Sequence, residues 1–211
     1  MFKISINDKD YEFPESFDDL TLRQYSAMYR GLKTSDDDMS ELDKFRLDRE
    51  NEGIIISRLL GEDDDFAMNL PLGIYALLNE KLSFMYGIDD IIKNARASIK
   101  IDGKRYMIPP SNEMQFRQYI DADIIAKEDD SDMQFIRMLS VLLLAKDDKG
   151  NWLPYKGEDA EMTRKLSELS CSEGLPLVMH FFKKRHALQK LTEASTEMET
   201  RIQSLHSIRN S

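Results

Sequence analysis

The chain has 211 residues, enough for one large domain or two small ones. Its 41% apolar and 32% charged residues are typical of a protein that folds around a core, and they exclude a disordered chain. The net charge of −10 disfavours sequence-independent binding to nucleic acid and to anionic membranes, because both need a surplus of Lys and Arg.

The first elements predicted are two strands joined by a tight turn. Apolar and polar residues alternate through 2–6 and again through 9–13, as they do in half-buried strands. Asn7-Asp8 between them is a turn pair, and Pro14 ends the second strand because proline donates no hydrogen bond to a sheet. The pattern therefore predicts a β-hairpin.

Helices are predicted to follow, separated by acidic loops. Thr21–Leu32 places Leu22, Tyr25, Met28 and Tyr29 on one apolar face. A second helix is expected over Ser40–Leu60, with Gly61 suited to its C-terminal cap. A third should run from Leu72 to about Gly87, and a short fourth over Asp89–Asn94.

The second half begins with another strand–turn–strand pattern, residues 97–111, whose Asp102-Gly103 pair is a strong hairpin signal. Helices are then predicted for Gln115–Ala126, Ser131–Ala145 and Glu158–Leu169. Residues 147–154 are expected to form a turn or a small hairpin. Leu175-Pro176-Leu177 is expected to open a last helix, as Leu70-Pro71-Leu72 does in the first half.

The two halves are similar in sequence. Residues 2–16 match residues 97–111 at an offset of 95, and Leu22-Arg23-Gln24-Tyr25 matches Phe116-Arg117-Gln118-Tyr119 at an offset of 94. A tandem duplication of a hairpin-plus-helices module is therefore predicted. The expected fold is mainly α with two small β-hairpins (α+β), in modules 1–95 and 96–185 followed by a long C-terminal helix, 186–211.

The matched tripeptides Arg23-Gln24-Tyr25 and Arg117-Gln118-Tyr119 are candidate functional residues. On a helix, each Tyr is expected to pack inward while Arg and Gln face a neighbouring element. The simpler interpretation is that Arg ties the hairpin to the helix. The functional alternative is a pseudo-symmetric binding surface made by both motifs.

The C-terminal stretch has a coiled-coil-like pattern. Apolar residues recur at steps of 3 and 4, which is the spacing of a helix seam that packs on a partner. The candidate interaction residues on this seam are Leu191, Met198, Ile202 and Leu205. Because the seam spans only about three heptads, it would need a partner or its own core to be stable.

No catalytic, cofactor or metal site is predicted. Asp36–Asp38 and Asp63–Asp65 lack the ligand spacing of a calcium loop, so solvated loops are expected. The sequence has no phosphate-binding glycine motif and no nucleophile elbow, and its three histidines lack zinc-site spacing. Cys171, the single cysteine, is expected to be an inert, buried thiol.

The location of the protein is expected to be intracellular. One cysteine allows no internal disulfide, and Met1–Asp10 lacks the features of a signal peptide. The longest apolar runs are far shorter than the roughly 20 residues that span a bilayer. Residues 1–95 hold 21 Asp and Glu against 11 Lys and Arg, which favours solubility or attraction to a basic partner.

Several segments together resemble a family of phage proteins. They are Phe13–Ser16, Leu20–Tyr25, Ile54–Gly61 and Asp63–Leu72. The pattern is similar to tail assembly chaperone-like helical proteins of tailed phages of gut bacteria. The resemblance implies a structural or assembly protein that binds other phage proteins of the tail, neck or baseplate. It also implies a place in the host cytoplasm during assembly, or in the virion.

The sequence therefore predicts a non-enzymatic phage assembly or virion protein that acts through protein–protein contacts. Its expected partners are other phage structural proteins, with self-association as an option and no nucleic acid or membrane. The alternative function is an acidic regulatory protein that inhibits a host factor by resembling nucleic acid. A hydrolase is the third option, and no sequence feature supports it.

Overall fold

The computed structural model describes residues 1–93, 96–110, 112–128, 131 and 133–180. Strands β1 (Phe2–Ile6) and β2 (Lys9–Phe13) form the predicted antiparallel hairpin. Asn7 and Asp8 join the strands with φ angles of 49° and 64°, which is the left-handed backbone of the favoured two-residue turn. The inner side of the hairpin carries buried apolar side chains.

Helix α1 (Leu22–Tyr29) starts at a capping box, in which Thr21 and Gln24 each accept a hydrogen bond from the other's backbone N–H. The helix ends three residues before the predicted end at Leu32. Helix α2 (Glu41–Leu59) has Ser40 as its N-cap and continues unbroken through Gly53. Gly61 follows with a φ of 72°, so the cap predicted there is confirmed.

The stretch predicted as a third helix divides into two parts. The first part is α3 (Leu72–Lys81), which a short 3₁₀ helix, η1 (Phe66–Asn69), precedes. The chain then tightens into a second 3₁₀ segment, η2 (Leu82–Gly87), before α4 (Ile88–Lys93). The predicted helix thus reaches Gly87, and its last six residues have 3₁₀ rather than α geometry.

The second hairpin joins β3 (Ser98–Ile101) to β4 (Lys104–Met107) through Asp102-Gly103, again with two positive φ angles. A short third strand, β5 (Leu144–Ala145), extends this sheet beside β4. The prediction of helix through Ala145 was wrong at its end, because Leu144 and Ala145 pair with Met107 and Tyr106.

Four helices complete the described chain. They are α5 (Phe116–Glu128), α6 (Gln134–Leu142), α7 (Ala160–Ser167) and a helix over 171–180. The last one begins four residues before the predicted start at Leu175. The fold is thus mainly α with two small β-hairpins, as predicted, and the same order of hairpin and helix occurs in both halves. The duplication itself stays a prediction.

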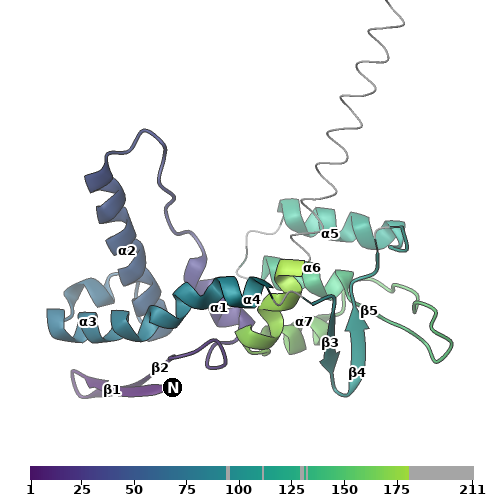
Figure 1. Ribbon diagram of the computed structural model, residues 1–211, viewed down its shortest axis with the longest axis horizontal. Coiled ribbons are helices and arrows are strands. Elements are labelled where there is room, and N and C mark those ends of the chain that lie inside the picture. The colour runs from purple at the N-terminus through teal and green to yellow at the C-terminus, as the bar shows by residue number, and fades with distance from the viewer. Residues whose placement is uncertain (94–95, 111, 129–130, 132, 181–211) are drawn as a thin grey trace, which may run out of the picture.

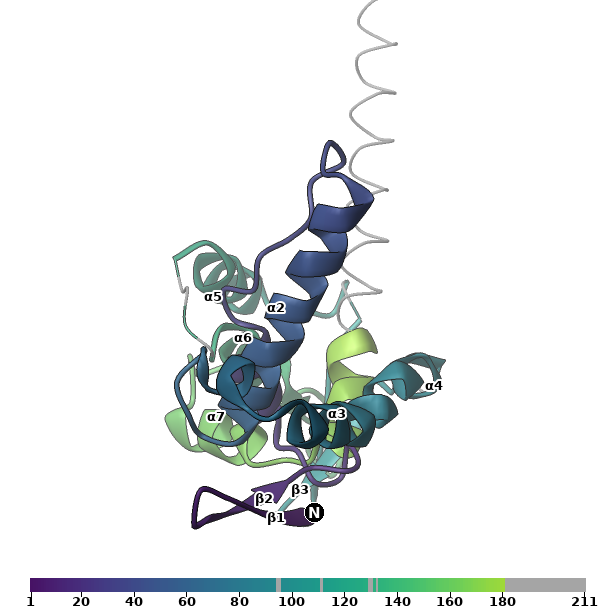
Figure 2. The same ribbon diagram turned by 90° about the vertical axis from the view of Figure 1, so that its left-hand side faces the viewer.

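The elements are spread along one long axis. Figure 1 shows the first hairpin, α2 and α3 at one end and the β3–β4–β5 sheet with α5 at the other, with α1, α6 and α7 between them. Figure 2 shows α2 rising from the body. The largest hydrophobic cluster combines Phe17, Leu20 and Leu22 with residues of α6, α7 and the helix 171–180. Both predicted modules therefore contribute to one core.

A backbone seam joins these two parts of the chain. Leu22 N–H donates to the carbonyl of Leu169 at 2.9 Å, and Cys171 N–H donates to that of Leu20 at 2.7 Å. Thr21 and Ser170 pair as an isolated antiparallel bridge. The segment before α1 and the segment after α7 thus satisfy each other's backbone groups, although about 150 residues separate them.

Candidate interaction surface

Helix α5 is held at both ends by side-chain hydrogen bonds. Gln115, just before the helix, donates to the carbonyl of Leu153 at 3.3 Å and accepts from the Tyr155 N–H at 3.1 Å. At the other end, Gln134 Nε2 donates to the carbonyl of Ala126 at 3.1 Å. These bonds join the start of α5 to the segment 153–155 and its last turn to Gln134, and so help to fix the orientation of the helix.

The inner face of α5 packs on α6. Ala122 and Ile125 are buried against Met138 and Leu142 of that helix. Gln118 lies on the same inner face, is fully buried, and donates through Nε2 to the carbonyl of Val141 at 2.9 Å. Its Oε1 has no hydrogen-bond partner among the described residues.

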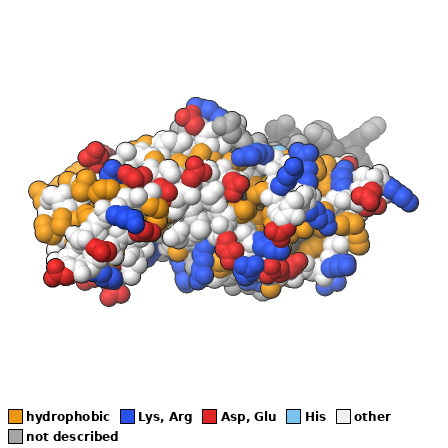
Figure 3. Space-filling model, turned by 90° about the horizontal axis from the view of Figure 1, so that it is seen from below, with side chains coloured by type: hydrophobic (Ala, Val, Ile, Leu, Met, Phe, Trp, Pro, Cys, Tyr) orange, Lys and Arg blue, Asp and Glu red, His pale blue; other side chains and the backbone are white. Residues whose placement is uncertain are grey.

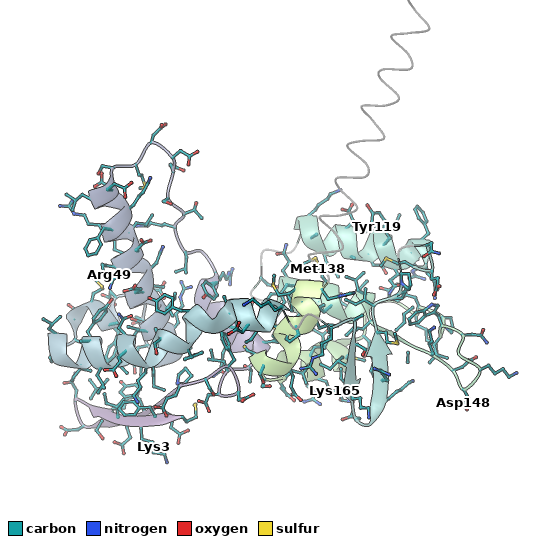
Figure 4. All side chains as sticks on the ribbon, in the orientation of Figure 1. Lys3, Arg49, Tyr119, Met138, Asp148 and Lys165 are labelled. Atoms are coloured by element: carbon teal, nitrogen blue, oxygen red, sulfur yellow. The ribbon has the colours of Figure 1, made fainter. Side chains whose placement is uncertain are left out.

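The opposite face of α5 is apolar and exposed. Phe116, Tyr119, Ile120 and Ile124 are 78%, 58%, 40% and 45% exposed. Steps of three and four residues put these side chains on one side of a helix, along about two turns. Figure 4 shows Tyr119 on α5 above Met138 of α6. Because Ala122 and Ile125 of the same helix are buried against α6, the four exposed residues point away from it. These four residues are the outer face of α5.

The charges on and beside this side of α5 are paired within the helix. Arg117 lies 4.0 Å from Asp121, and Lys127 lies 2.7 Å from Asp123. The hydrogen bond from Lys127 to Asp123 raises the pKa of the lysine. Exposed pairs of this kind contribute little to stability, so their side chains are free to exchange partners on contact with another surface.

The first predicted motif is largely structural. Gln24 belongs to the capping box of α1, and Arg23 is exposed. Tyr25 is half-buried with its ring 5.0 Å from that of Tyr29, and burial raises its pKa well above the usual range. The expectation that this tyrosine packs inward is confirmed.

In the second motif, Arg117-Gln118-Tyr119, a different residue faces the core. Gln118 is buried in place of a tyrosine, and Tyr119 is exposed, so the expectation of an inward tyrosine was wrong here. Arg117 is also exposed, and only Gln118 faces its neighbouring helix, α6. Because α5 packs on α6 and α1 on another part of the core, corresponding sequence positions face different surroundings.

The two motifs do not form one surface in this structure. Figure 1 shows α1 and α5 apart, with α6 beneath α5. Of the other candidate interaction residues, Leu191, Met198, Ile202 and Leu205 lie outside the described residues, so the C-terminal seam stays a prediction. The sequence interpretation missed Phe116, Ile120 and Ile124. Their i, i+4, i+8 spacing was the available signal.

The acidic loop 62–65 is occupied by structural contacts. Both oxygens of Asp64 accept hydrogen bonds of 2.7 Å from Arg58, which hold the pKa of the carboxyl below its usual range. Glu62 accepts from Lys9 and, at 2.8 Å, from the Tyr11 hydroxyl. In the described part of the chain, no group of three or more His, Cys, Asp or Glu is placed to hold a metal ion.

Exposed basic residues lie on the second hairpin, β3–β4. Figure 3 shows Lys and Arg side chains on the right-hand part of the lower face, where Figure 1 places β3 and β4. Lys100, Lys104 and Arg105 are the exposed basic residues of that hairpin.

Comparisons with known proteins identify no relative. No protein-family model matches the chain, and neither a curated protein nor a solved structure is significantly similar to it. None of the helices in the described residues is both long enough and apolar enough to cross a membrane.

Proposed function

We propose that this chain is an assembly or structural protein of a tailed bacteriophage and that it acts through protein–protein contacts. The observation that carries the proposal is the outer face of α5, where four large apolar side chains are exposed on a helix fixed in place. Scattered exposed apolar residues are common, but a contiguous group typically marks a contact with another protein.

The phage assignment rests on the resemblance of the first-half segments to tail assembly chaperone-like proteins. A chaperone would cover the apolar surface of a tail subunit until assembly, whereas a tail, neck or baseplate component would keep the contact permanently. Both roles need an exposed apolar surface on a stable scaffold, and α5 supplies one. Neither role needs a catalytic group.

Acidic mimicry of nucleic acid has less support. Asp64 and Glu62 are held by Arg58, Lys9 and Tyr11, so the second acidic loop offers fewer free charges than its sequence suggests. Asp36–Asp38 are exposed, and so are Asp63 and Asp65 of the second loop.

The test is co-expression of the full chain with the products of genes adjacent to its own, followed by light scattering of the purified material. We expect a soluble complex with a tail, neck or baseplate protein. Ile124→Asp should abolish that complex, and Asp148→Asn, on an exposed turn far from α5, should retain it. Failure to bind any such protein, together with capture of a basic host protein, would support the inhibitor instead.

A further inference from the structure

We propose that the outer face of α5 binds the same face of a second copy of this chain, with the two α5 helices antiparallel about a two-fold axis near Ile120. This inference deepens the proposed function and rests on it in taking this face as an interface. A two-fold contact requires a surface complementary to itself, and the order of apolar and charged residues along α5 meets that requirement.

The apolar side chains match in the antiparallel arrangement. With Ile120 opposite Ile120 of the second copy, the position opposite Phe116 is Ile124, four residues away on the other side of the axis. The most exposed aromatic residue of the face thus meets an aliphatic one at both ends of the contact. Ile120, the least exposed of the four, lies at the centre, where burial on association is greatest.

The charges select the antiparallel direction. In this register Arg117 of one copy approaches Asp123 of the other. A parallel pair would bring Arg117 near Arg117 and Asp123 near Asp123. Because like charges in contact are unfavourable and opposite charges favour the correct partner and register, the charge order along α5 supports self-pairing in one direction only.

The contact is small. Residues 116 and 124 lie about 12 Å apart along the helix at about 1.5 Å per residue. A standard stable interface buries about 800 Å² on each partner, which is more than two helical turns usually provide. The dimer is therefore expected to depend on protein concentration and to exchange readily. Such a contact suits an assembly protein, because a phage partner with a larger surface can displace the second copy.

Disulfide trapping in the full chain tests the geometry directly. Cys171 is fully buried, so a cysteine introduced on α5 is the only accessible thiol. Ile120→Cys places two thiols across the axis, within the roughly 7 Å between Cα atoms that a disulfide tolerates. Under mild oxidation, we expect covalent dimers to form at least about ten-fold faster than with Asp148→Cys, because binding raises the effective thiol concentration.

A mixed experiment distinguishes the two directions. Phe116→Cys alone should link slowly, because antiparallel helices separate its two copies by about 12 Å. A mixture of Phe116→Cys and Ile124→Cys proteins should link rapidly. A parallel dimer would give the reverse result, with each variant linking to itself, and would overturn the proposal.

Charge exchange tests the proposed contact between Arg117 of one copy and Asp123 of the other. Arg117→Glu or Asp123→Arg alone should reduce the dimer fraction seen by light scattering, and the double variant should restore it. All three should keep the helical circular dichroism of the wild type. Loss of the dimer in every variant, the double one included, would argue against the register.

The result that overturns the proposal is a wild-type chain that stays monomeric over about a hundred-fold range of concentration, with Ile120→Cys linking no faster than Asp148→Cys. Protection of the introduced thiol in that monomer would assign the face to residues 181–211 of the same chain. A monomer that still binds a tail protein through Ile124 would leave the proposed function intact while refuting the dimer.

Discussion

Leu22 lies directly against Gly174. A Cβ placed on Gly174 would come within 2.4 Å of Leu22 Cδ1 and 2.6 Å of Leu22 Cγ, closer than real atoms approach. Leu22 is the first residue of α1, and Gly174 belongs to the helix 171–180. This contact lies beside the backbone hydrogen bonds that join Leu20 and Leu22 to residues 169–171. The absence of a side chain at position 174 therefore lets the two helices meet.

Gly174→Ala should destabilise the protein. Alanine favours helix over glycine by up to about 1 kcal/mol, but the new methyl group overlaps a fully buried leucine. Overpacking of this kind costs about 1–3 kcal/mol, so we expect a net loss, measured by urea unfolding. Gly73→Ala in α3 is the matched control, because nothing lies within 4 Å of that Cβ. A Gly174→Ala protein as stable as the Gly73→Ala one would contradict the packing.

Arg58 should be among the most important charged residues for stability. Its guanidinium binds Asp64 with two hydrogen bonds of 2.7 Å and donates to the carbonyls of Ala27 and Met28 at the end of α1. It therefore joins α2, the loop 61–65 and the last turn of α1, where carbonyls lack partners within the helix. Arg58→Met should lower the free energy of unfolding by about 2 kcal/mol, because charged hydrogen bonds are lost together.

Arg164→Met is the control for Arg58. Arg164 also makes hydrogen bonds with two carboxylates, those of Glu161 and Glu168, but these pairs lie on the exposed surface of α7 and its C-terminal end. Pairs of that kind contribute little to stability. If urea unfolding shows that both variants lose the same free energy of unfolding, Arg58 acts only as a surface charge.

Local features of the fold were predictable from sequence. Both hairpin turns carry residue pairs that tolerate positive φ, and Ser40 and Gly61 mark the ends of α2. These signals depend on the backbone preferences of the residues themselves. The end of α6 was not predictable in this way, because Leu144 leaves the helix to pair with Met107 in a distant strand.

The candidate site was less predictable than the fold. Sequence similarity aligns Phe116 with Leu22, yet Leu22 is fully buried and Phe116 is 78% exposed. Helical periodicity shows which residues share a face but not which of two apolar faces meets the core. The buried position on α5 is taken by Gln118, whose bond to the Val141 carbonyl exists only in the folded protein. Which face of α5 packs on the core therefore depends on tertiary contacts, and the sequence pattern alone does not decide it.

Asp64 should make the stability depend on pH in the acidic range. Hydrogen bonds from Arg58 lower its pKa below the ordinary 3.8, so between the two values the unfolded chain binds the proton that the folded one does not. The contribution of the Asp64 carboxylate to the free energy of unfolding is fully present above pH 3.8. It is lost as the pH falls through the pKa of the folded state. The difference in urea midpoint between wild type and Asp64→Asn should shrink on acidification below that pH.

Cys171 should be unreactive until the molecule unfolds. Its thiol is buried, donates to the carbonyl of Thr21 at 3.3 Å, and has a pKa raised by burial to about 12. Since the thiolate is the reactive form, both the charge state and the burial protect it in the folded protein. Reaction requires separation of residues 17–22 from residues 169–172, and that seam belongs to the main core.

The labelling rate of Cys171 with an aromatic disulfide reagent should therefore rise with urea in parallel with the unfolded fraction seen by circular dichroism. A cysteine introduced by Asp148→Cys should react at once in native buffer, because that position is exposed. If Cys171 reacts in native buffer nearly as fast as that exposed thiol, the seam opens without global unfolding. The helix 171–180 would then be able to detach from α1 while the rest of the core stays folded.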